Sequence, residues 1–348
     1  MVTIKDVARA ARVSVATVSR VHNNSGPVTE GTRRRVRAVA TRLGYAPHAA
    51  ARTLSTNRTS TVGVLLPDLY GEFYSELIRG IDQMAQRHGY HLLVASSHDQ
   101  KPTIEAALQS MRGRVDGLLV MSPAPGAYGA VRDLPASFPV VLLNSAAAGR
   151  AFDSLAVANA QGARAMVHHL IALGHRRVAM IAGPAKNSDA AGRLRGYRAA
   201  LRDAGVRATP AWEIPGDFTE TSGFAACLKL LAERSPLRPT AIFAANDAMA
   251  IGALSALREA HVLVPGDMAV AGFDDIPMAR YMHPPLSTVR VNISALGERA
   301  TRRLLDAVAN GRQHQKRRET LPVTLVIRES CGGRGQPATA SPPKEGPR

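Results

Sequence analysis

Cysteine is scarce in this chain, whose 348 residues include only Cys227 and Cys331. The two are far apart, and neither lies in a Cys-x-x-Cys or Cys/His spacing, so the sequence supports neither a disulfide framework nor a zinc site. Long apolar runs are missing as well. No segment reaches the roughly 18 apolar residues of a membrane span, and the first residues lack the apolar core of a secretory signal. We therefore expect a cytoplasmic protein with no membrane partner.

The motifs of several enzyme classes are also absent. The chain contains no G-x-S-x-G, no G-x-x-x-x-G-K-[ST], no H-E-x-x-H and no strand-linked G-x-G-x-x-G. The neighbouring His168 and His169 have no paired acidic residues. We expect a protein that is not an enzyme, with no catalytic residues, no metal and no cofactor.

Positive charge, by contrast, is in excess and unevenly spread. The formal net charge is +17. Residues 1–60 contain 11 Lys or Arg against two acidic residues, and residues 312–348 contain eight against three. A basic head on a nearly balanced body indicates a polyanion-binding module joined to another domain. General use of arginine as surface charge is the alternative, but it would spread the excess evenly.

The head, residues 1–47, has the pattern of three short helices. A first helix is expected over residues 4–11 after the N-cap Thr3, a second over 15–23 after the N-cap Ser14, and a third from Thr29 or Glu30 to Leu43, ended by Gly44. The tight break between the first two helices is the plan of a helix-turn-helix. Residues 48–61 follow as a hinge with a short helical stretch, which is too short to be stable alone.

From Thr61 onward, apolar strand patterns alternate with amphipathic helices. The strand candidates are residues 62–66, 90–96, 115–121, 140–144, 177–183, 241–246 and 268–275. This alternation predicts an α/β core of two doubly wound parallel-sheet halves, with a ligand in the crevice between them. We place the core at 62–330, with lobes of about 62–159 plus 290–320 and 160–289 plus 321–330, and a disordered tail at 331–348.

Several motifs in order resemble the lactose/galactose repressor (LacI/GalR) family of bacterial transcription regulators. The resemblance rests on TIKDVARAARVSVATVSRVHNN, TRRRVRAVATRLGYAP, VDGLLVM, HLIALGHRRVAMIAGP, GRLRGYRAAL, FAANDAMAIGAL and VAGFDDIPMARYMHPPLSTV, and it extends to about Ser330. It implies a helix-turn-helix head, a hinge helix, and a core like a periplasmic sugar-binding protein that dimerises and senses a small effector.

The second helix is expected to contact DNA bases. Val18 and Val21 face inward, which leaves Val15, Ala16 and Arg20 outward, and the resemblance implies that these three set the operator sequence. Arg20 can pair with guanine, whereas Val15 and Ala16 offer methyl contacts. The alternative is that Val15 only packs the helix against the head. The expected partners of DNA phosphates are Ser14, Thr17, Ser19, Asn23, Tyr45 and Arg52.

In the hinge, the resemblance implies that Leu54 wedges into the minor groove at the operator centre. The alternative is a helix-end residue that packs on the core. Two short hinges can stabilise each other only when a dimer holds them together, so an effector could change DNA affinity by a population shift.

The effector is expected in the crevice between the halves. The candidates are Asp68, Phe73, Tyr74, Asn187, Asp189, Arg193, Phe218, Asn246 and Asp274. The resemblance implies that Arg193, Asn246 and Asp274 hold the ligand. Planar donors and acceptors, with aromatic rings beside them, suit a sugar, while an amine or a purine derivative stays open.

Four residues depart from the family pattern. Arg12 stands where Gly or Asn is usual, His22 where leucine is usual, His48 where Asn or Ser caps the hinge helix, and Ala158 where an acid is usual. We expect strain at Arg12, because that turn position favours left-handed backbone.

The predicted function is therefore a DNA-binding transcription regulator. We expect a repressor that acts as a homodimer on a pseudo-palindromic double-stranded operator and answers to a small effector, most simply a carbohydrate. A purine-sensing regulator is one alternative, and a solute-binding protein without a DNA role is another. An enzyme is the third, because α/β folds serve many chemistries.

Overall fold

The computed structural model describes residues 2–22, 26–45, 58–98, 100–121, 127–144, 151–232 and 238–333. It divides into a small unit, residues 1–61 with 113–116, and a large unit of residues 62–112 and 117–348. Each is described by itself.

The small unit contains the three predicted helices, α1 (Ile4–Ala10), α2 (Val15–His22) and α3 (Glu30–Arg42). Each end forms as the sequence predicts. Thr3 and Asp6 make a capping box, the Ser14 hydroxyl accepts a hydrogen bond from the Thr17 N–H at 3.1 Å, and Gly44 takes a φ of +63° after α3. Val7, Val18, Val21 and Val36 meet in a small core. The basic head therefore folds around alternating apolar positions, with its charges outside.

Arg12, in the turn between α1 and α2, adopts a φ of +52°. A β-carbon is disfavoured in this left-handed region, which glycine and asparagine tolerate better. The expected strain at this turn is therefore present.

The predicted hinge lies largely outside the described residues, and so do His48, Arg52 and Leu54. At its end, Thr59 donates to the Asp116 carboxylate from its N–H at 2.6 Å and its hydroxyl at 2.8 Å. The Ser60 N–H donates to the other oxygen at 2.9 Å. Asp116 thus anchors the chain directly before the first strand.

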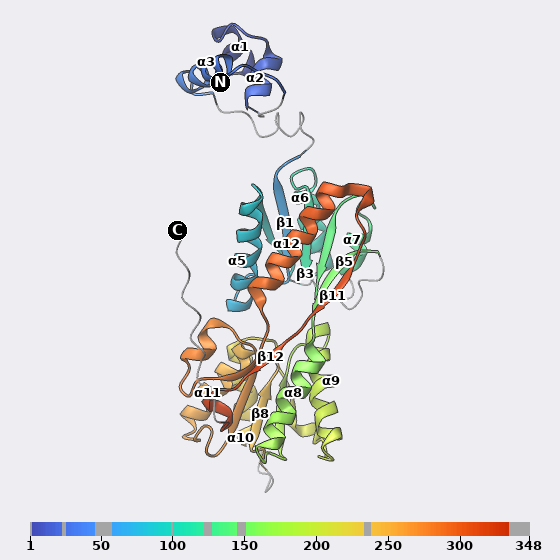
Figure 1. The fold of residues 1–348 in the computed structure, drawn as a ribbon. Helices are drawn as coiled ribbons and strands as arrows, with labels where there is room; N and C mark the ends of the chain where they lie inside the picture. Colours follow the sequence, from blue (N-terminus) through green and yellow to red (C-terminus); the bar gives the residue numbers. More distant parts are fainter. Residues whose placement is uncertain are drawn as a thin grey trace, which may run out of the picture. The chain divides into compact units, whose positions relative to one another are not determined.

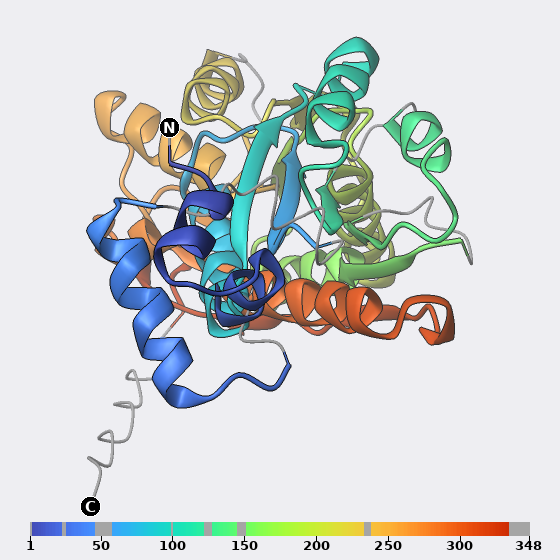
Figure 2. The ribbon, with the colours of Figure 1, turned by 90° about the horizontal axis from the view of Figure 1, so that it is seen from above.

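The first lobe of the large unit is a six-stranded sheet in the order β11-β5-β4-β3-β1-β2. Its strands are β1 (Thr61–Leu66), β2 (His91–Ser96), β3 (Gly117–Met121), β4 (Val140–Leu143), β5 (Asp153–Val157) and β11 (Arg318–Leu321). Its helices are α5 (Glu72–Arg87), α6 (Lys101–Met111), α7 (Ala127–Arg132) and α12 (Ile293–Asn310). Figures 1 and 2 show α12 on one face of this sheet and α6 on the other, so apolar strands are buried on both sides.

The second lobe repeats this plan with the order β12-β10-β9-β8-β6-β7. Its strands are β6 (Val178–Ala182), β7 (Glu213–Pro215), β8 (Ala241–Ala244), β9 (Ala269–Asp274), β10 (Ser287–Arg290) and β12 (Thr324–Val326). Its helices are α8 (Asn159–Ala172), α9 (Ser188–Asp203), α10 (Glu220–Ala232) and α11 (Asp247–Glu259). Short 3-10 turns lie at Pro210–Trp212, Pro277–Tyr281, Gly311–Gln313 and Glu329–Cys331. Neighbouring strands in the described registers run parallel except β10 with β12. The prediction of two doubly wound halves is confirmed.

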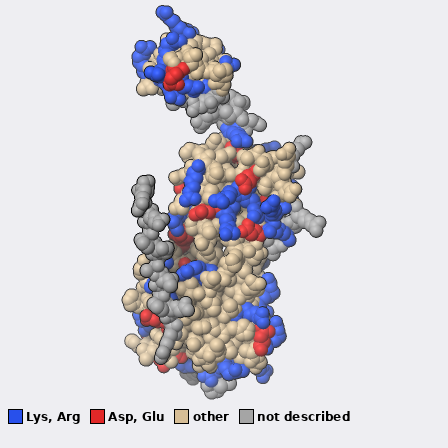
Figure 3. Space-filling model, in the orientation of Figure 1, with Lys and Arg blue, Asp and Glu red and all other residues tan. Residues whose placement is uncertain are grey.

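Arginine also gathers on the first lobe. Figure 3 shows Lys and Arg side chains over α12 and β11, where Arg299 and Arg303 both pair with Glu319. The Arg299 side chain is exposed, so its pair contributes little to stability, about 0–1 kcal/mol.

Candidate functional site

The outward face of α2 in the head carries the predicted base-contacting residues. Val15 is 41% exposed, and Ala16 and Arg20 are exposed as well, whereas Val18 and Val21 are buried. This exposure favours the contact role of Val15 over the alternative that it serves only to pack the helix. A small apolar surface beside an exposed guanidinium is suited to thymine methyl groups and a guanine edge.

The predicted phosphate contacts are less uniform. Ser14 and Thr17 lie at the start of α2, with their hydroxyl oxygens 2.9 Å apart, and Ser19 is half-buried. Tyr45 is half-buried against the head. Asn23 lies outside the described residues, like Arg52 and Leu54. Ser14, Thr17, Ser19 and Tyr45 therefore share one small unit, and their contacts with DNA stay a prediction.

His22 takes the place of a core residue. Its ring lies edge-on to Tyr45 with centroids 5.5 Å apart, and its Nε2 is buried without a hydrogen-bond partner among the described residues. Burial, with Arg37 nearby, lowers the pKa of His22. The imidazole therefore packs here as a neutral ring in a site that would suit leucine.

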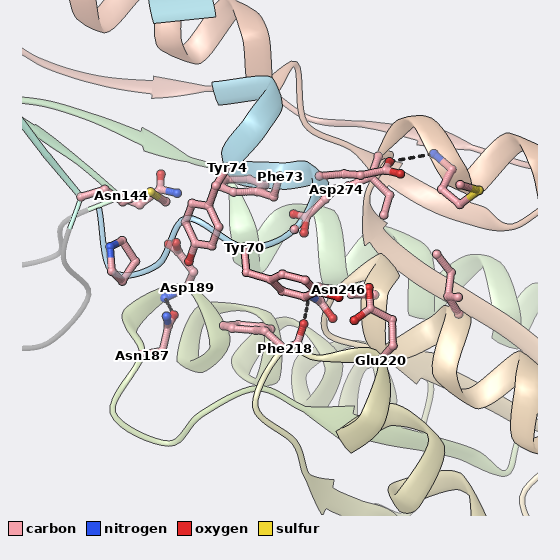
Figure 4. Close-up of a pocket in the computed structure, with 18 of the residues that line it drawn as sticks. Tyr70, Phe73, Tyr74, Asn144, Asn187, Asp189, Phe218, Glu220, Asn246 and Asp274 are labelled. Carbon is pink, nitrogen blue, oxygen red and sulfur yellow. Dashed lines mark hydrogen bonds between the residues drawn. The ribbon is translucent and has the colours of Figure 1, made fainter. Parts of the chain in front are cut away.

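A cavity of about 250 Å³ lies between the two lobes of the core. Its predicted lining residues are Phe73, Tyr74, Asn187, Asp189, Arg193, Phe218, Asn246 and Asp274. Figure 4 shows Phe73 and Tyr74 reaching it from α5, while Asn187, Phe218 and Asn246 approach from the second lobe. The carboxyl ends of parallel strands bring these polar groups together, as the crevice rule predicts.

Asp68 was expected in this set, but it is not among the lining residues. Its carboxylate accepts hydrogen bonds from the N–H groups of Leu69 and Tyr70, at 2.6 and 3.1 Å. Aspartate commonly closes a turn in this way. We therefore correct the assignment of Asp68 from ligand contact to a turn residue that shapes the loop before α5.

Arg193 is the best-anchored side chain of the cavity. It is 4% exposed, and it donates to Asn159 Oδ1 at 2.9 Å, to the Ala245 carbonyl at 2.5 Å and to Asp274 Oδ1 at 2.9 Å. Its guanidinium also lies 3.9 Å from the centre of the Phe273 ring. The bonds hold the guanidinium plane fixed, so Arg193 presents a rigid polar wall to a ligand.

Asn187 and Asn246 each have a structural task in addition to lining the cavity. Asn187 Oδ1 accepts from the N–H groups of Asp189 and Ala190, and Asn246 Oδ1 accepts from Met249 N. Both residues thereby cap a helix. They place the positive ends of α9 and α11 at the cavity, where ligand oxygens can be bound.

Several lining residues were not predicted. They include Tyr70, Glu72, Asn144 and Glu220. Asn144 is 3% exposed, takes a φ of +51°, and leaves its Oδ1 without a hydrogen-bond partner among the described residues. Strained backbone collects at functional positions, and Phe218 and Asp274 also have positive φ. The sequence could have suggested Asn144, because it directly follows the predicted strand end. Its left-handed backbone and its Oδ1 without a hydrogen-bond partner are visible only in the structure.

Acidic groups dominate the cavity. Glu72, Asp189, Glu220 and Asp274 line it together with a single arginine. Burial raises the pKa of Asp189 to about 6, and it also raises the pKa of Asp274 to about 6, while Arg193 opposes both shifts. Behind them, burial raises the pKa of Asp247 well above its usual range, and the charge of Asp274 adds to this. The site is therefore poor for anions and rich in acceptors for hydroxyl or amino groups.

The buried acids predict a pH dependence of stability. Because folding raises their pKa, the folded state binds more protons, so the free energy of unfolding should be highest near pH 4 and fall as pH rises through about 6. In Asp247→Asn the amide oxygen can still accept from the Ile276 N–H, and the amide NH₂ can donate to the Thr288 hydroxyl, so this variant should flatten the fall. Urea unfolding at several pH values measures it. Asp203→Asn, whose exposed parent has a lowered pKa beside Arg164, is the control. An unchanged slope in Asp247→Asn would contradict the assignment.

The described residues contain no group of three or more His, Cys, Asp or Glu side chains placed to hold a metal ion. No described helix combines the length and the apolar character needed to span a bilayer.

Comparison with known proteins addresses both the head and the core. Residues 3–48 match the model "Bacterial regulatory proteins, lacI family", and residues 167–331 match "Periplasmic binding protein-like domain". The ribose operon repressor of Escherichia coli (strain K12) is 37% identical over 93% of this chain and 98% of its own length. The transcriptional repressor PurR of Escherichia coli O139:H28 is 35% identical, covering 96% and 98%.

Among solved structures, the Lac repressor dimer bound to operator and the anti-inducer ONPF is similar, with a TM-score of 0.84 and 31% identity. The match covers 95% of this chain and 99% of that one. Identity above 30% over nearly the full length, with head and core in the same order, is decisive. The chain belongs to the LacI family of bacterial regulatory proteins.

Proposed function

We propose that this protein is a transcriptional repressor that binds operator DNA through its head. Its affinity for the operator falls or rises when a small effector binds in the cavity between its lobes. The observation that carries this is the combination of an exposed α2 face, with Val15, Ala16 and Arg20, and a polar cavity in the same chain. It acts in the cytoplasm and is not an enzyme. The predicted contacts of the head with DNA bases and phosphates, and of Leu54 with the minor groove, are part of this proposal.

The effector is a sugar or a sugar derivative. Carboxylates and amides around a cavity of about 250 Å³ can bind neighbouring hydroxyls, while Phe73, Tyr74 or Phe218 stacks on the C–H face of a ring. The 37% identity with a ribose operon repressor supports a sugar. The same aromatic rings could enclose a purine, and the 35% identity with PurR supports that second candidate.

The protein works as a homodimer on a pseudo-palindromic site. A ligand that binds one arrangement of the lobes more tightly shifts the population toward it, and the two heads move with their cores. DNA affinity can then change although the effector and the DNA bind to different parts of the chain.

Operator binding is the first test. Selection from a random duplex library, followed by gel shifts at two salt concentrations, should yield a pseudo-palindromic site with salt-sensitive binding. Arg20→Ala should relax the preference at one base pair per half-site, at a cost of about 1–3 kcal/mol. Arg42→Ala, on the exposed end of α3, is a matched control. Failure to select any sequence would contradict the repressor function.

Effector binding is the second test. Thermal shift with ribose, cellobiose and free purine bases should reveal a ligand that raises the melting temperature. Asp274→Asn should remove the shift, whereas Asp267→Asn, an exposed residue of the same lobe, should retain it. A shift that survives Asp274→Asn would move the site elsewhere.

A further inference from the structure

A second pocket of about 280 Å³ lies behind the effector cavity, at the start of α8. Its lining includes Asn144, Asn159, Ala160, Ser188, Asp189 and Arg195. Asn144 and Asp189 line both pockets, so these two side chains form a wall between them. The proposed function gives this second pocket no task.

The N-terminus of α8 faces this pocket without a side-chain cap. Its N-cap residue is Ala158, which offers no acceptor, and the first turn contains no acidic residue. The first N–H groups of any α-helix have no acceptor within the helix, and they carry a partial positive charge. Such a helix start accepts an anion readily when a cavity adjoins it.

Arg195 brings a full positive charge to the same place. It is exposed, and it makes no hydrogen bond or ion pair within the described part of the chain. The buried Gly192 lies between the two features, and a β-carbon there would be only 3.1 Å from Asn159 Cβ. A β-carbon placed there would lie 3.7 Å from Arg195 Nη2 and 3.9 Å from the Ala160 backbone nitrogen. A guanidinium and a free helix N–H can therefore reach one small group between them.

Asn144 adds an independent sign of a ligand. The residue is 3% exposed and its side chain is hydrogen-bonded to Asp189, but its Oδ1 has no partner among the described residues. A buried acceptor without a donor is rare, and it marks a place where a hydroxyl or amino group completes the structure. Asp189, the neighbouring acid, already accepts from Asn159 Nδ2 at 2.8 Å, and its charge faces Arg193.

We propose that this pocket binds a small hydroxylated anion, a phosphate ester of a polyol or a hydroxy acid. The anionic group lies at the start of α8 beside Arg195, and the hydroxyl donates to Asn144 Oδ1. The proposal does not depend on the identity of the effector. The pocket differs from the effector cavity in charge, because Arg195 and the start of α8 lie beside Asp189 here, whereas Glu72, Glu220 and Asp274 add negative charge to the effector cavity.

Calorimetric titration of the full chain tests it with four probes. Glycerol 3-phosphate and glycerate represent the two sources of the anion, glycerol lacks the charge, and sulfate lacks the hydroxyl. At least one hydroxylated anion should bind saturably, with glycerol and sulfate about tenfold weaker or more. No saturable binding of either hydroxylated anion up to about 10 mM, an affinity that a single charged contact would already give, overturns the proposal.

Variants separate this pocket from the basic head, which also attracts phosphate. Ala158→Asp places a carboxylate at the helix start and should weaken binding about tenfold or more, while an aspartate N-cap preserves the fold. Ala158→Asn caps without charge and should weaken it less. Arg195→Gln should weaken binding. Arg202, an exposed arginine near the end of α9, the helix that also contains Arg195, is the control, and Arg202→Gln should leave binding unchanged. Equal binding in wild type, Ala158→Asp and Arg195→Gln would place the anion elsewhere and overturn the proposal.

Discussion

Replacing Arg193 with methionine is expected to destabilise the core by about 3–5 kcal/mol and to abolish the response to effector. Methionine preserves much of the volume but none of the donors. Asp274, the Ala245 carbonyl and Asn159 Oδ1 would lose their partner in a region where Asp274 is 4% exposed. A buried charge without its counter-charge costs several times more than the pair contributes when intact, which is why the loss is large.

Urea unfolding measures the loss, and thermal shift with the identified effector measures the response. Arg198→Met is the matched control, because Arg198 is on the same helix and pairs with Glu213 on the surface at 2.5 Å. Its side chain is 53% exposed, so the expected cost is below about 1 kcal/mol. A loss of under 1 kcal/mol in Arg193→Met would show that the buried network does not stabilise the second lobe's side of the cavity.

Replacing Gly252 with alanine is the second change with a large expected effect, about 2–3 kcal/mol of destabilisation from a single methyl group. A β-carbon at Gly252 would lie 1.9 Å from the Glu220 carbonyl oxygen and 2.7 Å from the Phe224 nitrogen. Across the same contact, a β-carbon at Gly223 would lie 2.1 Å from the Met249 carbonyl oxygen. Helices α10 and α11 therefore touch backbone to backbone, and neither side can yield as a flexible side chain would.

The opposite sign is expected for Gly129→Ala. Gly129 also lies in a helix, α7, but a β-carbon there would meet nothing within 4 Å. Alanine in an open helical position stabilises by up to about 1 kcal/mol. Chemical denaturation of both variants compares them directly. Because Glu220 begins α10 and lines the effector cavity, Gly252→Ala should also weaken effector binding. Equal effects of the two substitutions would contradict the close packing.

Local patterns made the head predictable. Helix boundaries followed from caps at Thr3, Ser14 and Gly44, which act within a few residues. The seven predicted strands of the core are all present, because buried parallel strands are continuous apolar runs. Strand β5, Asp153–Val157, and the short β7, Glu213–Pro215, were missed, and β10, β11 and β12 were expected only as a returning segment near residues 286–328. Polar residues at the start of β5, Asp153 and Ser154, are buried but satisfied by distant groups such as Arg317, and no local pattern reveals this.

The candidate site was predictable to the extent that it follows strand ends. Asp274 and Asn246 come directly after or at the end of buried strands, and the fold carries them to one crevice. Tyr70, Glu72 and Glu220 lie in loops and helix starts, whose direction depends on how the two lobes face each other. Asp68 was predicted to contact the ligand because it follows the end of β1. Its carboxylate instead accepts hydrogen bonds from the backbone N–H groups of the next two residues.

The last strands of the two sheets lie close together in the chain. Strand β11 completes the edge of the first sheet, and β12, beginning three residues later, completes the edge of the second. A ribosome that builds this protein therefore cannot release one finished lobe and then the next. Both sheets are completed only when residues 318–326 have been synthesised. A chain that ends before residue 318 therefore has two incomplete sheets rather than one complete lobe.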